Sequence, residues 1–162
     1  MKIKKRTTLI LLAITLIAAF LRFYKIDRNP PSLTGDEISF GYAAYSILKT
    51  GRDESGRFLP LVIQSIGDYK NPLPAYLMVV SFKFFGVNDF AVRFQNALFG
   101  TLTVFVFFFF LFYLLKNDKQ ALLGSFFLAL SPWHIFYSRF AYEPLIASFF
   151  CSFRYMVFYE DA

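Results

Sequence analysis

Two adjacent carboxylates, Asp36 and Glu37, follow the first hydrophobic segment and open a helix-forming stretch. Placing a charged side chain at the edge of a membrane costs free energy, so charged residues there are often functional. We therefore take both residues as candidate catalytic residues. A structural alternative stays open, because Thr34-Gly35-Asp36-Glu37 matches a capping box in which Glu37 bonds back to the Thr34 amide. Acidic residues also favour a helix N-terminus through its dipole.

Cationic and polar groups that could bind an anionic substrate lie further along the chain. Lys70 precedes the helix start at Asn71, a natural phosphate position, and Tyr69 beside it is counted as a substrate contact. Arg139 could clamp a phosphate with two parallel hydrogen bonds, with Glu143 as a supporting carboxylate. Two alternatives remain: Lys70 as a solvated loop lysine, and Arg139 paired with Glu143 four residues later.

Other reactive residue types are scarce. The single cysteine, Cys151, excludes an internal disulfide and gives no sign of a metal cluster. His134 is the only histidine, and we interpret it as a hydrogen-bonded interfacial residue rather than a ligand or base. We therefore predict no metal site and no cofactor, although a divalent metal is not excluded.

The composition is that of a membrane protein. Hydrophobic residues make up 57% of the 162 residues, against roughly 45–50% in soluble domains. The net charge of +6 is concentrated before the first hydrophobic segment, where Lys2, Lys4, Lys5 and Arg6 stand. Such a cluster stays in the cytoplasm, which predicts a cytoplasmic N-terminus in the cell membrane. No soluble basic surface remains, so a nucleic-acid partner is not expected.

The hydropathy pattern predicts an all-α polytopic membrane protein, forming a single membrane domain over residues 1–162. A cytoplasmic tail (1–6) precedes span 1 (7–24), and an extracytoplasmic loop (25–88) leads to span 2 (89–115). Span 3 (121–137) contains Pro132, which predicts a kink. An incomplete span 4 (144–158) brings the total to about four. We interpret the chain as the truncated N-terminal part of a longer module, and an alternative that stays open is that this fragment is inactive by itself.

Two amphipathic helices are predicted inside the long loop, at 37–49 and 72–85, and both are short enough to lie along the membrane surface. The apolar face of the first is made by Phe40, Ala44, Ile47 and Leu48, and the stripe of the second by Leu73, Leu77, Val80 and Phe84. Span 1 could alternatively be a signal peptide, but it is longer than a usual h-region and lacks a good cleavage site.

The order of these features resembles a known family. A charged start and one span precede a loop that opens on Asp36-Glu37; Lys70-Asn71-Pro72-Leu73 then starts the second surface helix. Paired spans follow, then Ser-Pro-x-x-x-x-x-Ser-Arg-x-x-x-Glu from residue 131 to 143. This arrangement is similar to the N-terminal part of the GT-C membrane glycosyltransferases, in the protein O-mannosyltransferase and aminoarabinose-transferase branch. Close relatives often have Lys-Pro-Pro-Leu where this chain has Lys-Asn-Pro-Leu.

The resemblance implies transfer of a sugar from a polyprenyl-phosphate donor to an acceptor hydroxyl of a protein, lipid or glycan, on the extracytoplasmic face and with inversion. Asp36 then matches the catalytic base and Lys70 the contact to the carrier phosphate, while Arg139 and Glu143 match the charged site that ends the third span. Membrane lipids are the remaining partner. No Asp-x-Asp motif is present, which favours a metal-independent reaction.

Two other classes of protein remain as alternatives. A non-catalytic transporter or assembly subunit would use Arg139 and Glu143 as an intramembrane pair, but it has little need for two surface helices between its first spans. A secreted or anchored binding protein would require a cleaved first segment.

Overall fold

The structure, a computed structural model, describes residues 4–65 and 68–160. Helices dominate it, as the sequence predicts, and the only strands of the described part form one short antiparallel hairpin. The elements in chain order are α1 (Lys5–Phe23), α2 (Gly35–Thr50), β1 (Ile63–Ser65), β2 (Asp68–Lys70), α3 (Pro72–Phe85), α4 (Asp89–Leu115), α5 (Asp118–Leu130), α6 (Pro132–Ser138) and α7 (Glu143–Glu160).

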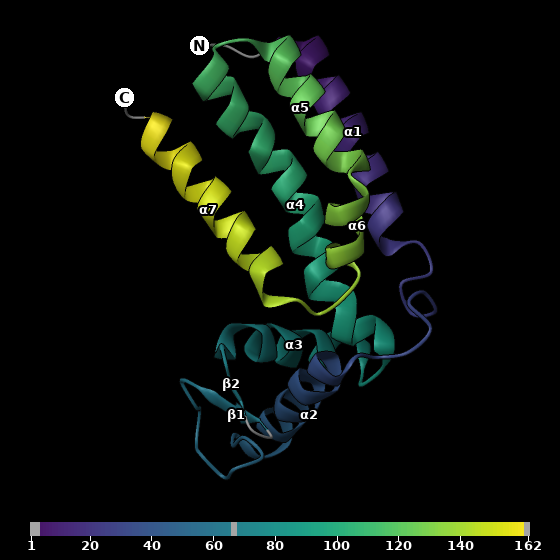
Figure 1. Cartoon of the computed structure of the whole chain (residues 1–162), viewed down its shortest axis with the longest axis vertical. Helices are drawn as coiled ribbons and strands as arrows, with labels where there is room; N and C mark the ends of the chain where they lie inside the picture. The colour runs from purple at the N-terminus through teal and green to yellow at the C-terminus, as the bar shows by residue number, and fades with distance from the viewer. Residues whose placement is uncertain (1–3, 66–67, 161–162) are drawn as a thin grey trace.

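The long helices form a bundle around α4, which contacts α1, α3, α5, α6 and α7. In Figure 1, α1 and α5 lie on one side of α4 and α7 on the other. Helices α2 and α3 and the hairpin form a separate layer across one end of the bundle, while α1 begins and α7 ends at the opposite end (Figure 1). The layer therefore sits where the chain emerges from span 1, as the predicted loop requires.

Two helices of the described chain, α1 and α4, are long and apolar enough to cross a membrane. Helices α5 and α6 qualify together as a third crossing, bent by 58° at their junction. The bend lies at Pro132, where the sequence predicts a kink. Helix α7 is not among the candidate spans of the described chain. The membrane character is therefore confirmed, and two or three candidate spans are found where the sequence predicts about four. The first three residues of the predicted tail lie outside the described residues.

Small residues let the neighbours of α4 approach closely. One face of α4 is marked by three buried residues, Ala97, Gly100 and Val104. They are three or four positions apart, which is the spacing of residues on one side of a helix. Val104 packs with Ala18 of α1 and Ala129 of α5 in one core cluster. The bundle is therefore held at its centre by short side chains, which fix the separations of the helices.

Gly100 is the tightest of these contacts, and it yields a test of the packing. A Cβ added there would clash with the Ser138 hydroxyl and lie 2.8 Å from the Ser138 Cβ. We expect Gly100→Ala to push α6 away from α4 and to cost about 1–3 kcal/mol, as overpacked cores do. Thermal unfolding in detergent measures this, with Gly35→Ala as control because no atom lies within 4 Å of its added Cβ. Equal melting temperatures for the two variants would contradict the close approach.

Local signals set the bounds of the two helices in the end layer. Thr34 caps α2 and Gly51 ends it with φ 71°, while Asn71 caps α3, with Pro72 in its first turn. The predicted apolar face of α2 is buried except for the half-buried Leu48. The outcome differs in α3, whose buried face is Pro74, Ala75, Met78, Ser81 and Phe82. Most of the predicted stripe, Leu73, Val80 and Phe84, is instead exposed and available to lipid.

Candidate functional site

The β1–β2 hairpin places Lys70. In its register Ile63 pairs with Lys70, and residues paired across an antiparallel ladder point to the same face. Ile63 is fully buried in the core shared by α2 and α3, so Lys70 is directed toward α2 as well. Only 9% of the Lys70 side chain is exposed, and its ammonium lies 5.0 Å from the centre of the Phe40 ring. Lys70 is therefore a fixed cation rather than a solvated loop lysine.

The partner of this cation is Asp36. Lys70 Nζ donates a hydrogen bond to Asp36 Oδ1, which closes an ion pair between the hairpin and the first turn of α2. The Asp36 side chain stays 68% exposed, so one of its faces remains open to an incoming molecule. The pair lines a pocket of about 210 Å³, together with Phe40, Tyr69, Ala141, Tyr142, Glu143 and Pro144. Four predicted site residues, Asp36, Tyr69, Lys70 and Glu143, thus converge in one cavity.

The start of α3 offers this pocket a dipole but few hydrogen-bond donors. Pro72 and Pro74 have no N–H, and the Leu73 amide donates to the Asn71 side chain. Backbone N–H groups therefore cannot cradle an anion here in the way a helix N-terminus often does. An anion in the pocket depends on the Lys70 ammonium itself.

Glu37 does not share the site of Asp36. Successive helical residues point about 100° apart, so when Asp36 faces the pocket, Glu37 turns into the protein. The Glu37 side chain is fully buried, and its Oε2 accepts from the Thr34 amide at 2.8 Å in a complete capping box. Its Oε1 accepts from Arg93 Nε at 2.9 Å and from the Ala141 amide at 3.4 Å. The structure therefore does not bring Glu37 into the pocket with Asp36, because both of its oxygens are engaged in holding the fold.

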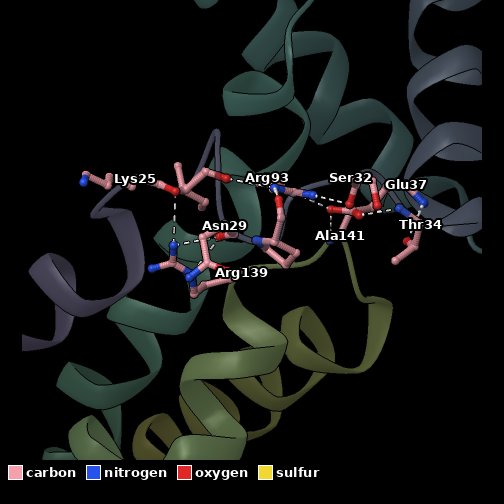
Figure 2. A network of polar contacts seen from close by, with 10 residues as sticks. Lys25, Asn29, Ser32, Thr34, Glu37, Arg93, Arg139 and Ala141 are labelled. Carbon is pink, nitrogen blue, oxygen red and sulfur yellow. Dashed lines mark hydrogen bonds and ion pairs between the residues drawn. The ribbon is translucent and has the colours of Figure 1, made fainter.

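Arg93 is the organising residue that the sequence did not single out. Besides Glu37, its guanidinium donates to the carbonyls of Ile26, Pro30 and Ser32 at 2.8–2.9 Å. Arg93 is fully buried in the first turns of α4, so its charge is neutralised by one carboxylate and three carbonyls. Figure 2 shows this network crossing from the loop before α2 to the segment that carries Ala141. Arg93 thereby links α4 to the loop before α2 and to Glu37, which in turn holds the amide of Ala141 in the pocket lining.

Arg139 lies outside the pocket. Its guanidinium donates to the carbonyls of Leu21, Tyr24, Lys25 and Asn29, at distances between 2.7 and 3.3 Å. Figure 2 shows the contacts with Lys25 and Asn29. Burial, and then the charge of Arg93, lower the pKa of Arg139 from its ordinary value, yet an arginine in a protein keeps its proton. The structure therefore does not bring Arg139 together with Asp36 and Lys70, because its donors cap the end of α1 and the turn after it.

The alternative pairing of Arg139 with Glu143 is not found either, since no ion pair joins them in the described chain. Arg139 ends α6 and Glu143 starts α7, so the two residues are not on one helix. The segment between them is tied down instead by Asn96 of α4, whose side-chain amide donates to the Tyr142 carbonyl at 2.8 Å. Tyr142 and Glu143 consequently form a fixed wall opposite Asp36 and Lys70.

No cluster of three or more histidine, cysteine or acidic side chains suited to a metal ion is found among the residues that the structure describes. The candidate chemistry is therefore that of one accessible carboxylate beside one largely buried cation. A carboxylate can accept a proton, and an ammonium can hold an anion.

Comparison with known proteins now bears on this arrangement. The family model for dolichyl-phosphate-mannose-protein mannosyltransferases matches residues 12–162, which is nearly the whole chain. The chain belongs to this family. Membership indicates a multi-pass membrane glycosyltransferase of the mannosyltransferase type and confirms the resemblance noted from the sequence. No curated protein and no solved structure gives a significant match to the chain.

Proposed function

We propose that this mannosyltransferase-family chain transfers a sugar from a polyprenyl-phosphate donor to an acceptor hydroxyl, in the pocket where Asp36 meets Lys70. The observation that carries the proposal is the ion pair itself. It sets an accessible carboxylate against a cation that is 9% exposed, at the end of the bundle where the chain leaves span 1. Asp36 is the general base, Lys70 the phosphate contact, and Tyr69 and Glu143 line the substrate site.

The reaction assigns one task to each charge. The acceptor oxygen attacks the anomeric carbon and forms the new glycosidic bond, while the bond from that carbon to the phosphate oxygen breaks on the opposite face. Asp36 takes the acceptor proton and stabilises the positive charge that develops on the sugar ring. The electron pair leaves with the polyprenyl phosphate, whose added negative charge Lys70 neutralises. The configuration at the anomeric carbon is inverted, and the atoms and charges of the reaction balance without a metal ion.

The ion pair also bears on the distance between the base and the donor phosphate in the site. One ammonium can donate to a carboxylate and to a phosphate oxygen at once, which places those two oxygens about 5 Å apart. Inverting hydrolases hold their two carboxyl groups about 6.5–9.5 Å apart, to leave room for the nucleophile. Donor and acceptor together must therefore lengthen the contact of Asp36 with Lys70. That change is local, because Asp36 is mostly exposed and lies in the first turn of α2.

The side of the membrane follows from charge. Lys4, Lys5 and Arg6 stand before or at the start of α1. Helix α2 and strand β2, which carry Asp36 and Lys70 of the pocket, lie at the other end of the bundle (Figure 1). With the basic cluster in the cytoplasm, the pocket opens on the extracytoplasmic face. The N-terminus is then cytoplasmic, and Leu73, Val80 and Phe84 of α3 face the outer leaflet.

Lys70→Met tests the donor contact. The assay uses membrane vesicles that carry the protein, radiolabelled polyprenyl-phosphate mannose and a serine- and threonine-containing peptide. A hydrogen bond to a charged group contributes about 1.5–3 kcal/mol, so we expect the KM for the donor to rise by about 10- to 150-fold. Lys70→Arg should recover part of the loss.

Lys83→Met is the matched control, because Lys83 is an exposed lysine of α3 outside the pocket. If Lys70→Met had the same KM for the donor as the wild type, Lys70 would be excluded as a contact of the donor. Absence of any transfer by the unaltered protein would overturn the proposed function.

A further inference from the structure

A second buried arginine, Arg22, lies inside the bundle and takes no part in the pocket. It is in the last turn of α1, with its side chain fully enclosed. One guanidinium nitrogen donates to the Ala18 carbonyl of its own helix at 3.0 Å. The other contacts cross to α5 and α6: the carbonyls of Ala129 at 3.3 Å and Leu128 at 3.5 Å, and His134 Nδ1 at 2.8 Å. A charge at this depth is costly unless its contacts are needed.

The two carbonyls are those that the break between α5 and α6 leaves short of donors. In a continuous helix the amide of residue 132 would donate to Leu128, but Pro132 has no N–H. The Ser131 amide, at the end of α5, donates to the same Leu128 carbonyl at 3.3 Å. The 58° bend ends the regular helical hydrogen-bond pattern there. Water cannot satisfy such groups inside a membrane, so a protein donor must. Arg22 is that donor, and its positive charge also interacts favourably with the negative, C-terminal end of the α5 dipole.

His134 connects the same guanidinium to the other side of the break. A guanidinium only donates hydrogen bonds, so Nδ1 of His134 must accept, and the ring proton then resides on Nε2. His134 is in the first turn of α6, whereas Leu128 and Ala129 end α5. One side chain from α1 thus holds both segments of the bent span at once.

We propose that Arg22 is a positioning residue, which fixes the bend between α5 and α6 and thereby the wall of the pocket formed by Tyr142 and Glu143. Helix α6 ends at Ser138, only four residues before Tyr142. A rotation of α6 would be passed directly to that wall. The consequence for catalysis rests on the proposed function, whereas the control of the bend does not.

A distance measurement across the break tests the bend. Spin labels are attached in a Cys151→Ser background at Leu123→Cys of α5 and Phe136→Cys of α6, both exposed positions. Pulsed electron resonance should give a single narrow distance distribution for the otherwise unaltered protein. We expect Arg22→Met to broaden or shift this distribution, because the Ala129 carbonyl and the His134 imidazole lose their contacts with Arg22, and the Leu128 carbonyl keeps only the Ser131 amide. Arg6→Met, an exposed arginine of the same helix, should leave the distribution unchanged.

An unchanged distribution in Arg22→Met would overturn the proposal, since Pro132 alone would then set the bend. If Arg22→Met does not fold, Arg22→Lys decides the question. A single ammonium keeps the charge but cannot span the same acceptors, so a broadened distribution supports the proposal and an unchanged one overturns it.

The consequence for catalysis is tested by measuring kcat and the donor KM of Arg22→Met separately. Among the described residues, the hydrogen bonds of Arg22 go to Ala18, Leu128, Ala129 and His134 and not to the pocket. The donor KM of Arg22→Met should therefore stay within about threefold of the wild type. Misplacing the wall should lower kcat by about 10- to 100-fold. An unaltered kcat would overturn the positioning role. Inactivity of the wild-type protein would instead overturn the proposed function, and the spin-label result would still decide whether Arg22 holds the bend.

Discussion

Asp36→Asn is expected to lower kcat for sugar transfer by about 10²- to 10⁴-fold, the range that a general base contributes. The amide has nearly the same shape as the carboxylate but cannot take the acceptor proton or stabilise positive charge on the sugar. It also releases Lys70 from its ion pair, which leaves the ammonium free for the donor phosphate. The KM for the donor should therefore stay the same or fall. A falling kcat with a constant or lower KM separates loss of a base from loss of binding.

Asp89→Asn is the matched control for this variant. Asp89 is likewise an exposed acidic residue in the first turn of a helix, but it lies outside the pocket. Its replacement should leave kcat unchanged. Radiolabelled transfer at saturating donor provides the measurement, and membrane insertion is checked by protease protection. A kcat for Asp36→Asn within about threefold of the wild type would exclude Asp36 as the base.

The sequence predicts the end layer well where the signals are local. Thr34, Asn71 and Pro72 set the starts of α2 and α3 through bonds that span three residues or fewer, so their spacing is visible in the chain. The hairpin is missed because each strand has only three residues, too few to show alternation. The buried face of α3 is missed because the helix is apolar on both faces, so periodicity alone cannot say which face meets the protein.

The arginines show where sequence reasoning fails. The structure places Asp36 and Lys70 of the motif order in one pocket. Arg139, interpreted from the sequence as a phosphate clamp, lies outside it, and Arg93 was given no role. Both guanidiniums bind backbone carbonyls of residues 21–32, and the positions of those carbonyls depend on how the loop folds. No spacing rule reports this. One signal was available for Arg93: a charged residue about one helical turn before the long apolar run that starts at Ala97 must be neutralised if it is buried.

Arg93→Met, in the first turns of α4, should cause a larger loss of stability than Gly100→Ala. It leaves the Glu37 carboxylate buried without its cation and frees the carbonyls of Ile26, Pro30 and Ser32. Breaking one partner of a buried pair costs about 3–5 kcal/mol. Thermal and denaturant unfolding in detergent measure the effect. Arg28→Met is the control, because the Arg28 side chain is 79% exposed and surface changes lie within about 0.5 kcal/mol.

A double variant separates the charge from the packing. Glu37→Gln keeps a residue type that can complete the capping box, so combined with Arg93→Met it removes both charges and preserves the cap. If the unpaired carboxylate causes most of the loss, the double variant should recover about half or more of the stability lost in Arg93→Met. If it recovers none, the contacts of Arg93 with the loop carbonyls dominate. In that case the arginine acts chiefly by folding the segment before α2, and Asp36 depends on it for its place beside Lys70. A melting temperature of Arg93→Met equal to that of Arg28→Met would refute both accounts.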